Sequence, residues 1–86
     1  MNRKDLLARL VRGEVHNVRF GDFTDLAEGF GFTIARQNGS HHIYSHPAVR
    51  ELVNLQEVGG EAKPYQIRQV LRLIERYNLV MTESRS

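Results

Sequence analysis

The sequence predicts an α+β fold in which an N-terminal helix precedes an α-β-β-β-α core, with a three-stranded antiparallel sheet covered by helices on one face. Three observations predict it. Apolar residues recur at helical spacing in three separate segments, and between the second and third segments the spacing changes to the alternation of strands. Asn38-Gly39 lies in that stretch and is the strongest short signal for a β-hairpin, because both residues tolerate positive φ.

The first helix is predicted within residues 1–18. Its apolar positions share one face: Leu6, Leu7, Leu10 and Val11. Asn2, with Asp5 three positions later, is placed to cap the N-terminal end, and Gly13 is placed to end the helix.

The second helix is predicted from apolar residues on one face: Phe23, Leu26, Ala27 and Phe30. Asp22 is placed to cap this helix, and Asp25 lies in the first turn, where the helix dipole favours a carboxylate. Gly31 is expected to end it.

The third helix is predicted from a longer apolar stripe: Ile67, Val70, Leu71, Ile74 and Tyr77. Pro64 suits its first position, because the missing N–H has no partner there, and Asn78 tolerates the left-handed conformation after the last turn. Residues 82–86 are expected to fray.

The segment between the last two helices predicts three strands. One side of residues 32–37 carries Phe32, Ile34 and Arg36, which indicates a half-buried first strand. The second strand covers residues 41–45 and is closed by Pro47, which cannot donate to a sheet. The third covers residues 52–56, after which Gly59-Gly60 leads into the last helix.

The composition limits the class of protein. We expect one domain over residues 1–86, with neither disulfides nor thiolate metal ligands, because the chain has no cysteine. No apolar run is long enough to cross a membrane, so a cytoplasmic protein is expected. Ten of the twelve basic residues are arginines, which suit bidentate phosphate and carboxylate contacts. A nucleic-acid partner, an acidic protein partner and an ordinary solvated surface all fit this composition.

One block of the sequence resembles the signature of HicA-type toxins: Gly39-Ser40-His41-His42-Ile43-Tyr44-Ser45-His46-Pro47. Its setting matches as well, with Gly31-Phe32 eight residues before Gly39 and a helix after the third strand. The resemblance covers residues 22–78, the toxin-like core, and leaves residues 1–18 as an added helix. Many family members carry a proline and a histidine near the end of the third strand, where this chain has Asn54-Leu55-Gln56. The chain therefore resembles a longer subgroup.

The resemblance implies a fold similar to the double-stranded-RNA-binding domain and a role in a type II toxin-antitoxin system. Members of the family cleave mRNA and are held inactive by an antitoxin, HicB, encoded beside them. The resemblance also implies that the histidine after Gly-Ser, here His41, is the catalytic general acid and base. We expect no cofactor.

Cleavage of this kind needs no metal ion, because the 2′-OH of RNA can attack the adjacent phosphorus. The enzyme takes a proton from that oxygen, gives one to the departing 5′-oxygen and holds the phosphate. An imidazole suits both transfers, since its ordinary pKa of about 6.5 leaves both forms populated near neutrality. Gly39 and Ser40 would let backbone N–H groups approach a phosphate, and Ser40 adds a hydroxyl donor.

Strand alternation gives His41 the face of Ile43, and gives His42 the face of Tyr44 and His46. If Ile43 faces the helices, His41 lies on the core side at the mouth of the strand, and His42 is its rival on the open face. Without the family motif, each histidine is more simply a surface or structural residue. A zinc site is not expected, because His42 and His46 are about 13 Å apart along the strand and His41 points to the other face.

Basic residues are candidates for holding the RNA backbone. Lys63 precedes the N-terminus of the last helix, where free N–H groups attract anions, and Arg68 and Arg72 lie four residues apart on that helix. Arg36 is close to the Gly39-Ser40 turn through the hairpin. The predicted RNA- or phosphate-binding residues are Gly39, Ser40, His42, Arg36, Lys63, Arg68 and Arg72. For the two helical arginines the alternative is an ordinary solvated face.

Two functions from different classes remain open. One is a ribonuclease toxin that depends on His41 and acts on mRNA, and the other is a non-catalytic RNA-binding or protein-interaction module on the same fold. The N-terminal helix either covers an apolar edge of the sheet or contributes to the antitoxin interface.

Overall fold

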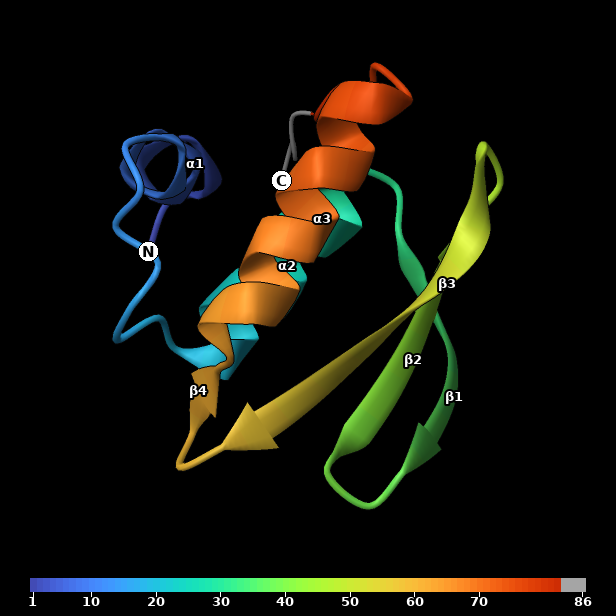
Figure 1. The fold of residues 1–86 in the computed structure, drawn as a ribbon, viewed down its shortest axis with the longest axis horizontal. Coiled ribbons are helices and arrows are strands. Elements are labelled where there is room, and N and C mark those ends of the chain that lie inside the picture. Colours follow the sequence, from blue (N-terminus) through green and yellow to red (C-terminus); the bar gives the residue numbers. More distant parts are fainter. Residues whose placement is uncertain (83–86) are drawn as a thin grey trace.

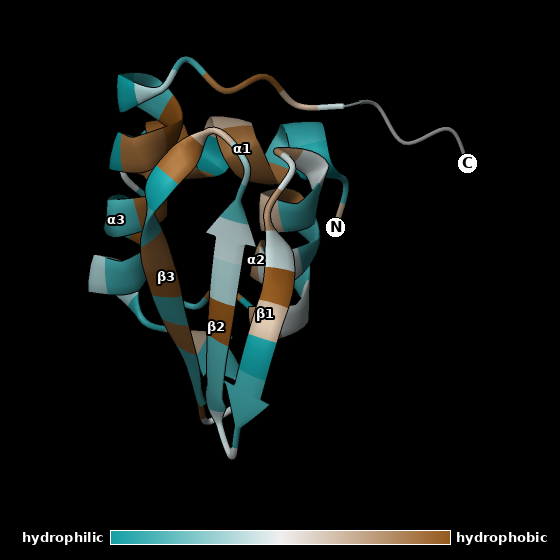
Figure 2. Ribbon diagram, turned by 90° about the vertical axis from the view of Figure 1, so that its right-hand side faces the viewer, coloured by the Kyte–Doolittle hydropathy of each residue, from teal (hydrophilic) through white to brown (hydrophobic). Residues whose placement is uncertain are grey.

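The computed structural model describes residues 1–82, which form three helices and one four-stranded sheet (Figure 1). The elements in chain order are α1 (Arg3–Val11), α2 (Phe20–Gly29), β1 (Thr33–Asn38), β2 (His41–His46), β3 (Val49–Val58), β4 (Glu61–Ala62) and α3 (Pro64–Arg76). The sheet is antiparallel in the order β1-β2-β3-β4, with the helices behind one face and the other face open (Figure 2). The α+β class and the helix order are confirmed.

The sheet has a fourth strand, so the prediction of three strands is wrong. β3 runs to Val58 rather than to residue 56, and the chain then reverses at Gly59-Gly60 so that β4 pairs with β3. The two glycines have φ of 60° and 80°, the conformation that a tight hairpin turn requires. The N–H of Ala62 donates to the carbonyl of Val18 at 2.9 Å, so the segment before α2 holds β4 from its other side.

α2 begins earlier than its predicted cap. The sequence places the N-cap at Asp22, whereas the helix begins at Phe20, and the N-cap residue Arg19 makes no side-chain capping hydrogen bond. The N–H of Phe20 donates instead to the β3–β4 turn, and Arg19 forms a β-bridge with Glu61. Tertiary pairing with β4 therefore replaces the side-chain cap. Asp22 lies in the first turn and pairs with the N-terminal amine of Met1 at 3.4 Å.

α1 follows the prediction at both ends but not along its whole face. The side chain of Asn2 accepts hydrogen bonds from two backbone N–H groups of the first turn, and Gly13 follows the last turn with a φ of 94°. Leu6 and Leu10 are buried in the core, whereas Val11 is 72% exposed. Val11 lies in the last turn of the helix, where it lines a groove between α1 and α3 and does not reach the core.

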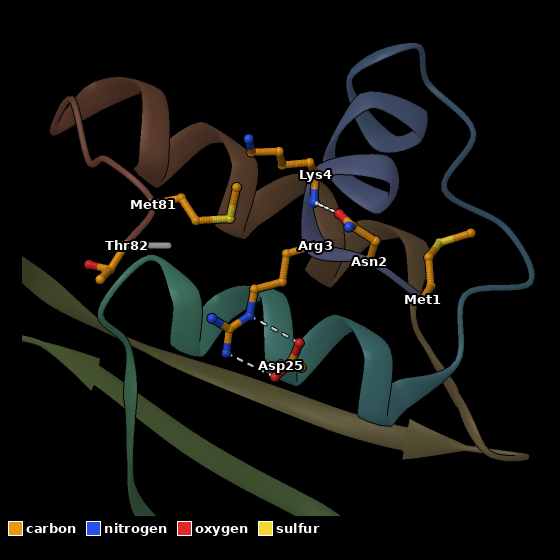
Figure 3. Close-up of a pocket in the computed structure, with 7 residues that line it drawn as sticks. All are labelled: Met1, Asn2, Arg3, Lys4, Asp25, Met81 and Thr82. Carbon is orange, nitrogen blue, oxygen red and sulfur yellow. Dashed lines mark hydrogen bonds and ion pairs between the residues drawn. The ribbon is translucent and has the colours of Figure 1, made fainter. Parts of the chain in front are cut away.

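Both the beginning of α1 and the segment after α3 are hydrogen-bonded to α2. Arg3 donates two hydrogen bonds to the carboxylate of Asp25, at 2.9 and 3.0 Å (Figure 3). Thr82 lines the same pocket, and its N–H donates to the carbonyl of Gly29 at 2.7 Å. Thr82 is thus held at the start of the tail predicted to fray, and the rest of that tail lies outside the described residues.

The hydrophobic core lies between the sheet and the helices. Its largest fully buried side chains come from every helix, from β3 and from the loops: Phe23, Phe32, Leu6, Leu10, Leu26, Leu55, Ile67, Val15, Val18, Val53 and Val70. α3 begins with Pro64, and Asn78 adopts the left-handed conformation beyond its end, both as predicted. Its buried apolar residues are Ile67, Val70 and Leu73. The predicted stripe therefore missed Leu73, and its members Leu71, Ile74 and Tyr77 are only partly buried. The backbone N–H of Gln56 in β3 donates to the side-chain oxygen of Gln66 at 2.8 Å, which joins the edge of β3 to α3.

The pairing of β2 with β3 decides which residues of β2 face the helices. Tyr44 lies opposite Val53, which is fully buried, so Tyr44 and its alternate neighbour His42 also face the helices. The open face therefore carries Ile43 and His41. The expectation that Ile43 faces the helices, with His42 on the open face, is wrong. Residues paired across two strands point to the same face, so the buried Val53 and Leu55 of β3 turn their partners Tyr44 and His42 towards the helices. Burial of these two β3 side chains therefore decides the orientation of β2, although Ile43 is itself apolar.

β1 contains a bulge that changes its alternation. Ile34 pairs with Tyr44 and Arg36 pairs with Ile43, so Ala35 is left without a partner. Ile34 consequently faces the helical side, whereas Arg36 faces the open side. The prediction that both residues share one side is wrong for Arg36. β1 is also not half-buried, because it forms an outer edge of the sheet and all six of its residues are exposed.

His46 joins the end of β2 to the end of α2. Its Nε2–H donates to the carbonyl of Phe30 at 2.9 Å, and its Nδ1 accepts from the N–H of Ala48 at 3.0 Å. These partners require the neutral Nε2–H tautomer. The ring packs edge-on against Phe32 and covers Gly31, which has a φ of 99°. His46 is a structural residue.

The close contact at Gly31 can be tested by substitution. A Cβ at Gly31 would lie 2.7 Å from His46 Nε2, whereas a Cβ at Gly13 would meet nothing within 4 Å, although Gly13 has a similar φ of 94°. Both alanine variants therefore share the backbone strain, and only Gly31→Ala adds the clash. We expect Gly31→Ala to lower the free energy of unfolding in urea by about 1–3 kcal/mol more than Gly13→Ala does. Equal losses would contradict the contact.

Glu51 connects β3 to the end of α3. Tyr77 donates its hydroxyl hydrogen to one carboxylate oxygen at 2.8 Å, and Arg76 donates to the other at 2.9 Å. The hydrogen bond from Tyr77 is the main cause that lowers the pKa of Glu51, and Arg76 adds to it.

This lowered pKa makes stability depend on pH in acid. Because the folded pKa lies below the ordinary value of 4.5, the contribution of Glu51 is fully present above that value and is lost as the pH falls through the folded pKa. We expect the difference in unfolding free energy between the natural protein and Glu51→Gln to shrink from about pH 7 to about pH 3. Glu75→Gln is the matched control, because it removes a carboxylate of α3 and leaves the link to β3 intact. A difference that stays constant with pH would refute this role.

Candidate functional site

The turn between β1 and β2 consists of Gly39 and Ser40. Asn38 pairs with His41, so the turn lies one residue later than the predicted Asn38-Gly39. Gly39 has a φ of 64°, while Asn38 and Ser40 have no positive φ, which is the pattern of a type II′ turn. The carbonyl of Ser40 accepts from the N–H of Glu57 at 3.2 Å, so the turn is fixed to β3.

The open face of the sheet carries polar side chains around His41. The strand registers place two rows of neighbouring residues on this face. Each row has one residue from β1, one from β2 and one from β3: Arg36–Ile43–Asn54 and Asn38–His41–Gln56. Figure 2 views this face, with the β1–β2 turn at its lower end. Asn38, His41 and Asn54 are exposed. In these two rows an imidazole, three amides and one guanidinium thus share a surface that is open to a large ligand.

His41 makes a side-chain hydrogen bond on this face. Its Nδ1 lies 3.2 Å from Oδ1 of Asn54, on the neighbouring strand. The amide oxygen can only accept, so the ring donates through Nδ1–H, and in the neutral ring Nε2 then carries the lone pair. The arrangement suits proton transfer at Nε2.

His42 lies on the helical side of the sheet and supports the turn. Its Nδ1 is 3.1 Å from the carbonyl of Ser40, and its ring centroid is 4.9 Å from that of Phe20 at the start of α2. The side chain is half-buried. His42 and His41 are therefore directed to opposite faces.

The structure brings Arg36 to the face of His41 but places the other predicted basic residues elsewhere. Lys63 is the N-cap residue of α3, and its ammonium lies 5.6 Å from the ring centroid of Tyr65. Arg68 and Arg72 are exposed on α3, in the helical layer on the other side of the sheet (Figures 1 and 2). A single phosphate bound at His41 would have Arg36 as its neighbouring guanidinium.

Two hollows of about 340 and 550 Å³ lie among the helices. The first is lined by the beginning of α1, Asp25 and residues 81–82 (Figure 3). The second is lined mostly by apolar residues of α1 and α3, together with Phe30 and Leu79. Neither is lined by a residue of the open face. Within residues 1–82, no group of three or more His, Cys, Asp or Glu side chains could hold a metal ion. None of the helices in this part of the chain has the length and apolar character to span a bilayer.

Asn54 and Gln56 belong to the site, although the sequence does not single them out as site residues. The available signal is their alternation with Val53 and Leu55, which are buried. That alternation predicts one outward face on β3, but the position of His41 on the same face depends on the register between β2 and β3.

The comparison with known protein families identifies the family of the chain. A family model described as the HicA toxin of bacterial toxin-antitoxin systems matches residues 21–75, which is more than half of the chain. The match runs from the first turn of α2 to the last turn of α3, so α1 lies outside it. No curated protein and no solved structure matches the chain significantly. The chain therefore belongs to the HicA toxin family and is a toxin that acts together with an antitoxin.

Proposed function

We propose that this toxin is a metal-independent endoribonuclease that cleaves mRNA in the cytoplasm, with His41 as general acid and base. The observation that carries the proposal is the exposed imidazole of His41 on an open sheet face that also presents Arg36. We further propose a HicB-type protein as the antitoxin. Within a single domain over residues 1–86, residues 22–78 would be the toxin-like core and residues 1–18 the added helix.

The reaction follows from the chemistry of RNA. Nε2 of His41 accepts the proton of a ribose 2′-OH as its oxygen attacks the adjacent phosphorus, and the bond to the 5′-oxygen breaks. The departing oxygen takes up a proton from the imidazolium, which leaves a 2′,3′-cyclic phosphate and a 5′-hydroxyl end. Arg36 neutralises charge on the phosphate oxygens, and the Gly39-Ser40 turn adds backbone N–H groups and the Ser40 hydroxyl as donors.

The remaining basic residues serve the RNA chain away from the scissile phosphate. Lys63, Arg68 and Arg72 lie at the start of α3 and along its exposed side, in the helical layer, so they would contact phosphates only where a longer RNA passes round to that side of the sheet. His42 takes an indirect part, because its ring holds the carbonyl of Ser40 and thereby the turn next to His41.

Cleavage of RNA by the purified protein in excess chelator tests the proposal. We expect cleavage by the natural protein and a loss of at least about 100-fold in His41→Ala, because general acid-base catalysis contributes a factor of this size. His16→Ala is the matched control, since His16 is an exposed histidine in the loop between α1 and α2. If all of these proteins bind RNA and none cleaves it, the nuclease proposal is wrong and the protein is a non-catalytic RNA-binding module.

The salt dependence of RNA binding tests the part of Arg36. Each contact between a basic side chain and a phosphate of single-stranded RNA adds about 0.7 to the slope of log affinity against log salt concentration. In the His41→Ala background, where RNA stays intact, we expect Arg36→Ala to reduce that slope by about 0.7. Arg12→Ala is the control, because Arg12 follows α1 and pairs with Glu14 at 3.3 Å. An unchanged slope in Arg36→Ala would show that Arg36 does not contact an RNA phosphate.

A further inference from the structure

We propose that Asn54 is a positioning residue that holds His41 in the Nδ1–H tautomer and so leaves Nε2 free to accept a proton. The catalytic consequence rests on the proposed nuclease function. The tautomer itself is a property of the folded protein and can be measured whether or not RNA is cleaved.

The backbone places Asn54 on the face of His41. Val53 and Leu55, its neighbours in β3, are 0% and 1% exposed, so the alternation of the strand turns the side chain of Asn54 to the open face. Asn54 pairs with Ile43, one row away from His41, and diagonal neighbours of this kind are within reach of long side chains. Asn54 Oδ1 lies 3.2 Å from His41 Nδ1.

The chemistry of the amide decides the tautomer. A neutral imidazole carries one proton, and an amide oxygen has none to give, so the hydrogen bond requires Nδ1–H and an unprotonated Nε2. His46 on the same strand has the opposite tautomer, because its Nδ1 accepts from the N–H of Ala48 and its Nε2–H donates to Phe30. Two histidines on opposite faces of β2 are therefore held in different tautomers by different partners.

Asn54 fixes the ring without bringing a charge to it. The charged side chains that the register and alternation place on the open face are Arg36 from β1 and Arg50 from β3. A carboxylate at position 54 would stabilise the imidazolium, whereas the neutral amide orients the ring without favouring the charged form. Asn54 therefore sets the orientation of the His41 ring, and other groups on the face set the equilibrium between imidazole and imidazolium.

Nitrogen NMR of the histidine rings tests the tautomer directly. At a pH where the rings are neutral, we expect His41 of the natural protein to be protonated at Nδ1, and His46 to be protonated at Nε2 as an internal reference. Asn54→Ala should move His41 towards the Nε2–H form, with His46 unchanged. Asn38→Ala is the matched control, because Asn38 lies directly opposite His41 on β1, and should leave the His41 tautomer unaltered. Nε2–H in the natural protein, or an unchanged tautomer in Asn54→Ala, would overturn the proposal.

Kinetics test the consequence for cleavage. We expect Asn54→Ala to lower kcat by about 10- to 100-fold with little change in KM, the range lost when the hydrogen-bonding partner of a metal-bound histidine is removed. Asn54→Asp keeps the acceptor and should retain most of kcat, with the acid limb of its pH profile moved to higher pH. Full kcat in Asn54→Ala would refute the positioning role. Absence of cleavage by the natural protein would refute the nuclease proposal alone, because the NMR result stands independently.

Discussion

The burial of Val53 and Leu55 against the helices is the constraint on which the candidate site depends. Both side chains lie in the core, and the register passes their alternation from β3 to β2, so Tyr44 and His42 face inward. His41 is left on the open face as a result. A slip of one residue between β2 and β3 would exchange the faces and bury the imidazole proposed to act on RNA.

The bulge in β1 decides on which face of the sheet the positive charge of Arg36 lies. Without the unpaired Ala35, Arg36 would continue the alternation of Ile34 and face the helices. The extra residue turns Arg36 to the side of His41 and places a guanidinium near the imidazole. A single residue without a partner thus assembles groups from two strands into one patch, at a sheet edge that the helices leave exposed.

Three histidines on one strand have three different environments. His46 is held between the carbonyl of Phe30 at the end of α2 and the N–H of Ala48 between β2 and β3, and His42 supports the turn against Phe20. His41 is the one of the three that lies on the open face, and its partner is a neutral amide from β3. The same residue type therefore stabilises the fold on one side of β2 and presents a titratable ring on the other. α1, which lies outside the family match, is fastened to α2 through Arg3 and Asp25 and adds to the core without touching this face.

The sequence by itself determined the three helices and the order of the helices and the first three strands. It did so because apolar spacing, Asn2 as a cap, Pro64 at a helix start and the glycines at helix ends act within a few residues. The Gly-Ser-His-His block likewise indicated the family and His41. Only the tertiary structure decided the start of α2, the fourth strand and the face on which each histidine lies. These features depend on pairings between distant segments: Phe20 with the β3–β4 turn, β3 with β4, and Val53 with Tyr44. Asn54 and Arg36 join His41 for the same reason, since a strand has two faces and only its neighbours choose between them.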